Sequence, residues 1–128
     1  MSSHPNPRTG MDAGIDQLIS LDAREVGDSY LVTVAGEVDM VTTPRLRSYL
    51  KQQIERAGSM LVLDLRRITF LGSSGLAVLV EVLDWTRARS IALRLVCDSR
   101  EVVRPLEATG LTELFEIHTE PDTALTPC

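Results

Sequence analysis

Four stretches of hydrophobic residues along the chain predict β-strands. Leu18–Val26 is apolar with polar interruptions, and Tyr30–Gly36 follows it after the turn signal Gly27–Asp28, which predicts a hairpin. Met60–Leu65 is almost entirely apolar, as expected for a strand buried on both faces. Ile91–Cys97 predicts a fourth strand.

Two segments between these strands have the features of helices. The first begins at Thr43, a predicted N-cap with Pro44 at the first helical position, and ends near Gly58, a predicted C-cap. Its apolar residues recur at helical spacing: Leu46, Leu50, Ile54 and Ala57. The second helix is expected from Ser73 to about Arg89.

The C-terminal third of the chain predicts shorter elements. Asp98 forms a capping-box pattern with Glu101, which indicates the start of a third helix. Pro105 lies inside that pattern, so the helix must be kinked or begin late. Gly110–His118 predicts a turn and a final strand, and a last short helix is expected near Pro121.

The predicted order β-β-α-β-α-β-α-β indicates an α/β fold, with one mixed sheet of four to five strands and helices packed on it. Right-handed crossovers make the strands near 30–36, 60–65 and 91–97 parallel, so their C-terminal ends share one edge of the sheet. Open α/β sheets bind ligands at this edge, and Asp39 and Ser73 are predicted neighbours there. The loops expected at the edge are Glu37–Thr43, Arg66–Ser73 and Asp98–Ser99.

A length of 128 residues fits one domain. Residues 1–14 contain Pro, Gly, Ser and Asn without periodicity and predict a flexible tail. The domain is expected over residues 15–122, with a flexible end over residues 123–128.

The helix after Ser73 carries two apolar stripes where one would suffice to cover a sheet. Leu76, Leu79, Val80 and Leu83 share one face, which we expect to pack on the sheet. The second stripe is formed by Val78, Val82 and Trp85. It either packs against a neighbouring helix or forms a partly exposed docking surface.

Charge and composition narrow the range of functions. A net charge of −5 argues against a general nucleic-acid binder, which needs a basic face. The chain start lacks the apolar core of a signal peptide, and the longest uncharged apolar run, Leu76–Val80, is too short to cross a bilayer. We therefore expect a cytoplasmic protein with no membrane partner. Cys97 is expected as a buried strand thiol, and Cys128 ends the chain; the pair forms no zinc-site spacing.

Motifs for catalysis, metal binding or cofactor binding are not found. The serines of "GSSG" do not form the G-x-S-x-G nucleophile elbow, and no Walker A, GxGxxG or HExxH motif is present. The histidines are His4, in the predicted tail, and His118, near the last strand, and nothing in the pattern brings His118 to Ser73. The sequence therefore predicts a protein that is not an enzyme and needs no cofactor.

The two serines at the start of the second helix allow two interpretations. One is a helix cap. The other is a modification site, because a helix N-terminus favours an anion and a phosphate on Ser73 would add charge without refolding the domain. The residues alone leave both open.

Three segments, taken in order and spacing, resemble the STAS domain family, in particular bacterial anti-sigma factor antagonists. "LVLDLRRITFLGSSGLAVLVEV" (Leu61–Val82) resembles the family signature, and "VAGEVDMVTTPRLR" (Val34–Arg47) resembles its G-E-[LV]-D loop. "LEATGLTELFEIH" (Leu106–His118) resembles the closing helix, turn and strand. The likeness covers residues 17 to 118.

The resemblance implies binding to an anti-sigma factor that is a serine kinase with a GHKL-type ATPase fold. The unmodified antagonist occupies this partner and frees a sigma factor; phosphorylation breaks the complex, and a PP2C-type phosphatase reverses it. The acceptor in the family motif [DN]-S-[ST]-G-[LV] corresponds to Ser73, followed by Ser74, and Asp39 corresponds to the loop acid of the kinase-binding surface. The expected partner-binding residues are Glu37, Asp39, Thr42, Gly72, Ser74, Gly75, Val78, Val82 and Trp85.

Gly72 departs from the family pattern, which has an acidic residue or Asn before the acceptor serine. An alternative function is therefore a constitutive STAS scaffold, or a sensor-associated binding module, that phosphorylation does not regulate.

Overall fold

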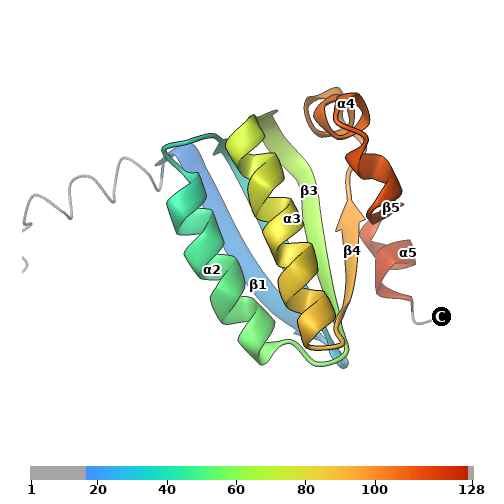
Figure 1. Cartoon of the computed structure of the whole chain (residues 1–128). Helices are drawn as coiled ribbons and strands as arrows, with labels where there is room; N and C mark the ends of the chain where they lie inside the picture. The colour runs from blue at the N-terminus through green and yellow to red at the C-terminus, as the bar shows by residue number, and fades with distance from the viewer. Residues whose placement is uncertain (1–16, 127–128) are drawn as a thin grey trace, which may run out of the picture.

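The computed structural model describes residues 17–126, which form a five-stranded sheet with helices packed on it (Figure 1). The predicted tail over residues 1–14, His4 and Cys128 lie outside the described residues. The elements are β1 (Ile19–Val26), β2 (Ser29–Val38), α2 (Thr43–Arg56), β3 (Met60–Leu71), α3 (Ser73–Ala88), β4 (Ala92–Val96), α4 (Arg100–Ala108), the 3-10 helix η1 (Leu111–Glu113), β5 (Glu116–His118) and α5 (Pro121–Leu125).

The sheet has the strand order β1-β2-β3-β4-β5. β1 pairs antiparallel with β2, and each following strand is parallel to its neighbour. The predicted hairpin, the parallel strands and the α/β class are therefore confirmed. Each parallel connection runs through a helix, as is usual for the crossover that parallel pairing requires.

β3 is buried on both faces in its first half, as its apolar sequence predicts. Leu61 and Leu63 belong to the main core under the helices. Met60 and Val62 pack on the opposite face with Ala124 of α5. The two clusters show that the sheet separates a large core from a smaller one.

α3 lies between two other helices on the same face of the sheet. It contacts both α2 and α4, and Figure 1 shows α2 and α3 side by side over the sheet. Val78 and Val82 are fully buried as a result, with 0% exposure. Of the two alternatives for this stripe, packing against a neighbouring helix is confirmed for Val78 and Val82, and an exposed docking surface is wrong for them. A helix with neighbours on both sides needs apolar residues on most of its circumference.

β3 is longer than the sequence pattern predicts. It continues to Leu71, so the expected loop over Arg66–Ser73 is largely strand. β4 pairs with β3 only as far as Asp64, so the loop after β4 lies several residues short of the end of β3. The Asp98–Ser99 loop therefore does not reach the edge where Asp39 and Ser73 lie.

The helix ends differ by a residue or two from the predicted caps. α2 has Thr42 rather than Thr43 at its N-cap and ends before Ala57, with Gly58 beyond it. Gly58 is packed against Asp28, so its small size serves close packing rather than a C-cap. The capping box predicted from Asp98 is also wrong, because Ser99 is the N-cap of α4 and makes no side-chain cap hydrogen bond.

α5 confirms the short helix expected near Pro121 and extends the fold beyond residue 122. The Arg94 side chain, 5% exposed, donates from Nη1 to the carbonyl oxygens of Ala124 at 2.8 Å and Thr126 at 2.6 Å. Residues 123–126 are thus attached to the sheet rather than forming a free end. Across residues 17–126, none of the helices has the length and apolar character needed to span a membrane.

Candidate functional site

The C-terminal ends of β2 and β3 and the start of α3 meet at one corner of the molecule (Figure 1). Glu37 lies opposite Phe70 in the parallel register. The amide of Gly72 donates to the carbonyl of Val38 at 2.9 Å, which ties the start of α3 to the residue before Asp39. The predicted proximity of the Asp39 loop and Ser73 is confirmed. We call this region the Ser73 corner; it comprises Glu37, Asp39, Met40, Val41, Phe70, Gly72, Ser73 and Ser74.

Ser73 is the first residue of α3 and is exposed. The N-cap is Gly72, with φ −90° and ψ 178°, and α3 has no side-chain cap hydrogen bond. The first turn is closed by the amides of Gly75 and Leu76, which donate to the Gly72 carbonyl at 3.0 and 3.1 Å. The cap interpretation of the serines is therefore wrong, and the Ser73 hydroxyl stays accessible at the positive end of the helix dipole.

Gly75 holds α3 close to the sheet. A Cβ atom at this position would lie 2.6 Å from Cγ1 of Val38 and 2.7 Å from Cδ1 of Leu71. Both distances are far below van der Waals contact, so only glycine fits without a shift. Gly75 is buried, and its predicted role in binding a partner is replaced by a structural one.

The loop between β2 and α2 is closed by its own polar side chains. Asp39 Oδ1 accepts hydrogen bonds from the amides of Val41 at 2.9 Å and Thr42 at 3.2 Å. Thr42 Oγ1 accepts from the Asp39 amide at 3.0 Å and donates to the Glu37 carbonyl at 2.8 Å. Thr42 is fully buried, so the expectation that it contacts a partner directly is wrong. Asp39 is half-buried and Glu37 exposed, and both remain available at the surface.

Three large apolar side chains at the Ser73 corner are exposed. Met40 is 82% exposed, Val41 58% and Phe70 52%. The Phe70 ring also approaches Gly72, since a Cβ there would lie 3.2 Å from Cε2 of the ring. Sequence reasoning missed these residues, although large apolar residues in a loop, next to a polar motif, could have indicated an interface. The corner therefore combines apolar contact area with acidic groups and an accessible hydroxyl.

Trp85 lies away from this corner, near the opposite end of α3. It is twelve positions after Ser73 along the helix, or about 18 Å. It is partly buried and lines a groove of about 310 Å³ with Lys51 and Ile54 of α2. Lys51 Nζ lies 5.3 Å from the centroid of the ring. The residue expected as an interface anchor thus belongs to the seam between α2 and α3.

His118 and Cys97 are also distant from Ser73 in the fold. His118 lies on β5, two strands from β3, and its Nε2 is 2.8 Å from Glu116 Oε2. Cys97 is buried, as predicted, directly after the end of β4, and burial raises the pKa of its thiol to about 11. Neither arrangement resembles an activated nucleophile.

Comparison with known proteins shows which family and which relatives the chain is similar to. Residues 20–124 match the STAS domain family. The chain is 32% identical over 100 residues to the anti-sigma-B factor antagonist of Listeria monocytogenes, covering 77% of this chain and 88% of that protein. It is 28% identical to the Bacillus subtilis anti-sigma-B factor antagonist, covering 77% and 90%. The crystal structure of an anti-sigma factor antagonist from Mycobacterium paratuberculosis superposes with a TM-score of 0.74 at 29% identity, covering 84% of this chain and 91% of that chain.

Proposed function

The chain belongs to the STAS domain family, and from this premise we propose that it is an anti-sigma factor antagonist. It binds an anti-sigma factor and thereby releases a sigma factor to direct transcription in the cytoplasm. The names of relatives that match most of the chain support this role. The fold and the Ser73 corner support a binding rather than a catalytic function.

The anti-sigma factor binds at the Ser73 corner. Met40, Val41 and Phe70 provide exposed apolar area, which is favourable to bury against a partner. Asp39 lies in a loop whose shape is already set by its own hydrogen bonds, so little ordering is needed on binding. A preformed loop beside an apolar patch is suited to specific recognition.

Phosphorylation of Ser73 switches the interaction off. The partner is an anti-sigma factor of the serine-kinase, GHKL ATPase type, and a PP2C-type phosphatase restores the unmodified form. A phosphate adds roughly −1.5 to −2 charges at the first turn of α3, which has no acidic residue of its own. The helix N-terminus tolerates this charge, but an apolar contact across Met40 and Phe70 would have to desolvate it.

The accessibility of the Ser73 hydroxyl, beside the Asp39 loop, is the observation that carries this proposal. The test is calorimetric titration of purified anti-sigma factors of the same bacterium with wild-type protein, Ser73→Ala and Ser73→Asp. Ser73→Ala should bind like wild type and stay unmodified when ATP is present, whereas Ser73→Asp should bind poorly. Ser74→Ala is the matched control, and it should still be modified. Equal binding by both Ser73 variants would place the switch elsewhere.

The alternative is a constitutive STAS scaffold or sensor-associated module. Gly72 favours it, because a glycine offers a kinase no side chain before the acceptor, and Phe70 lies over this position. Intact-mass measurement after incubation with each candidate kinase and ATP separates the two functions. A species heavier by one phosphate supports the switch, and its consistent absence, together with tight binding, supports the scaffold.

A further inference from the structure

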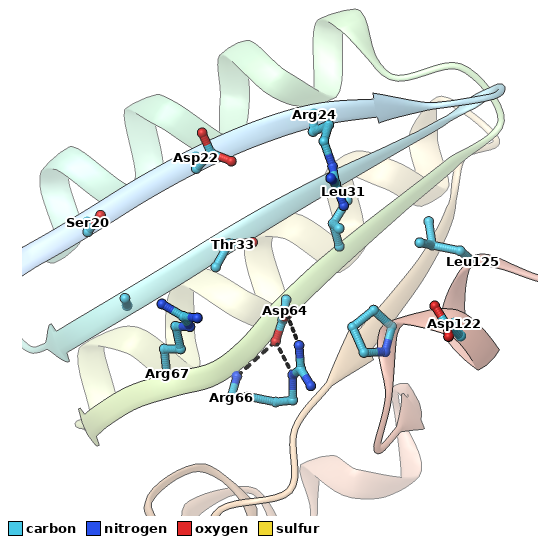
Figure 2. A pocket seen from close by; sticks show the side chains of 12 residues that line it. Ser20, Asp22, Arg24, Leu31, Thr33, Asp64, Arg66, Arg67, Asp122 and Leu125 are labelled. Atoms are coloured by element: carbon cyan, nitrogen blue, oxygen red, sulfur yellow. Dashed lines mark hydrogen bonds and ion pairs between the residues drawn. The ribbon is translucent and has the colours of Figure 1, made fainter.

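The face of the sheet opposite α2 and α3 carries an open groove of about 510 Å³ (Figure 2). α5 covers only part of this face, where Ala124 packs against Met60 and Val62. Among the described residues, Asp22, Arg24, Arg66 and Arg67 are exposed on this face, whereas Leu31 of β2 is buried against α5. The floor of the groove is formed by Leu31, Thr33 and Ala35 of β2.

A bulge in β3 turns two successive arginines toward this groove. Thr33 pairs with Asp64 and Ala35 with Arg67, so one residue of β2 lies opposite two residues of β3. Side chains of a regular strand alternate between faces. Here Arg66 and Arg67 both line the groove. Bulges commonly redirect side chains in this way next to binding sites.

The first of these arginines is neutralised within the protein. Asp64 accepts hydrogen bonds from Arg66 Nε at 3.0 Å and Nη2 at 2.8 Å, and from the Arg66 amide at 3.1 Å (Figure 2). The side-chain hydrogen bond to Asp64 raises the pKa of Arg66. Because this bidentate pair satisfies the buried carboxylate, Arg66 has a structural role.

Arg67 and Arg24 have no such partner. Neither forms a hydrogen bond or ion pair with any side chain in the described part of the chain, yet both line the groove. Both guanidinium groups are exposed, so they can contact an anion that enters the groove. The acids Asp22 and Asp122 also line the groove, so its charge is not uniform.

The strand register separates a polar end from an apolar end. Ala35 lies between Ser20 of β1 and Arg67 of β3, a row without an acidic residue. Four residues along β2, about 13 Å away, Leu31 lies beside Arg24, at the end where Pro121 and Leu125 of α5 form a wall. One end therefore offers a cation with a neighbouring hydroxyl. The other offers the partly exposed side chains of Pro121 and Leu125 beside the guanidinium of Arg24, whereas Leu31 in the floor is only 6% exposed.

We propose that this groove binds a small organic anion, whose phosphate or carboxylate is held by Arg67 and Ser20 and whose flat apolar body lies against Arg24, Pro121 and Leu125. A planar guanidinium can bind such an anion with two hydrogen bonds and can also stack on an aromatic body. The groove lies on the sheet face away from α3, so this site is separate from the Ser73 corner and does not depend on the proposed switch.

The test is an amide-resolved NMR titration of the full chain with 2-naphthyl phosphate, with inorganic phosphate and 2-naphthol as partial probes. We expect saturable shifts at the amides of Leu31, Thr33 and Ala35. Arg67→Gln should weaken binding about tenfold or more, because it removes a charge-assisted hydrogen bond to the anion. Arg87→Gln is the matched control, because it removes the same charge from an exposed arginine on α3, on the other face of the sheet.

Three results would overturn the proposal. One is a set of shifts that do not saturate or that spread over the whole surface. Another is an equal affinity of the wild-type protein and Arg67→Gln for 2-naphthyl phosphate, with melting curves showing that both proteins are folded. The third is a change in the chemical shifts of the groove amides with protein concentration in the absence of ligand, which would show that a second copy of the chain covers this face.

Discussion

Replacing Gly75 with alanine tests how the start of α3 is positioned. The new Cβ would lie 2.6 Å from Cγ1 of Val38 and 2.7 Å from Cδ1 of Leu71. Val38 has 0% and Leu71 6% exposure, so neither side chain can move toward solvent without opening the core. The helix must therefore shift away from the sheet, and Ser73 shifts with it.

The expected cost follows from two opposing effects. Overpacking a well-packed core costs about 1–3 kcal/mol. Alanine gains up to about 1 kcal/mol over glycine in a helix, and less in the first turn. The net free energy of unfolding should fall by about 1–2 kcal/mol, which corresponds to a melting temperature lower by roughly 5 °C for a domain of this size.

Urea denaturation and thermal melting of Gly75→Ala measure this effect, with Gly72→Ala as the matched control. At Gly72 the Cβ would be 3.2 Å from the half-exposed Phe70 ring, which can turn aside, and φ of −90° suits any residue. The control should stay within about 0.5 kcal/mol of wild type. A Gly75→Ala protein as stable as its control would refute the packing argument.

Two further predictions concern charge. Gly72→Asp adds a capping carboxylate to a helix without an acid in its first turn, and should raise the free energy of unfolding by about 0.5–1 kcal/mol at low salt and by less at high salt. A lower free energy of unfolding in urea denaturation would show that the Phe70 ring does not yield. Burial raises the pKa of Cys97 from 9.0 to about 11, so the unfolded thiol ionises first and stability should decline as pH rises between these values; an equal decline in Cys97→Ala would contradict this.

Much of the fold follows from local pattern and general topology. The apolar run from Met60 and the helical spacing after Pro44 predict elements that the structure confirms, and the helical crossovers between successive strands make those strands parallel. The second half of β3 was missed because its bulges break the alternation on which strand prediction depends. Arg66 and Arg67, adjacent and both polar, resemble a loop in sequence although they lie in a strand.

The site was predicted in part. The proximity of Asp39 and Ser73 follows from the rule that parallel strands end at one edge. The sequence leaves two roles open for Val78 and Val82, because a helical wheel shows which residues are apolar but not how many neighbours the helix has. The exposure of Phe70 depends on where β3 ends, which the sequence does not reveal.

Affinity for the anti-sigma factor, measured with unmodified protein and with protein phosphorylated at Ser73, tests the proposed switch most directly. The account predicts that the phosphate weakens binding at least about a hundredfold, or roughly 2.7 kcal/mol, while the melting curve of the free protein hardly changes. Equal affinity of the two forms for the partner would contradict it.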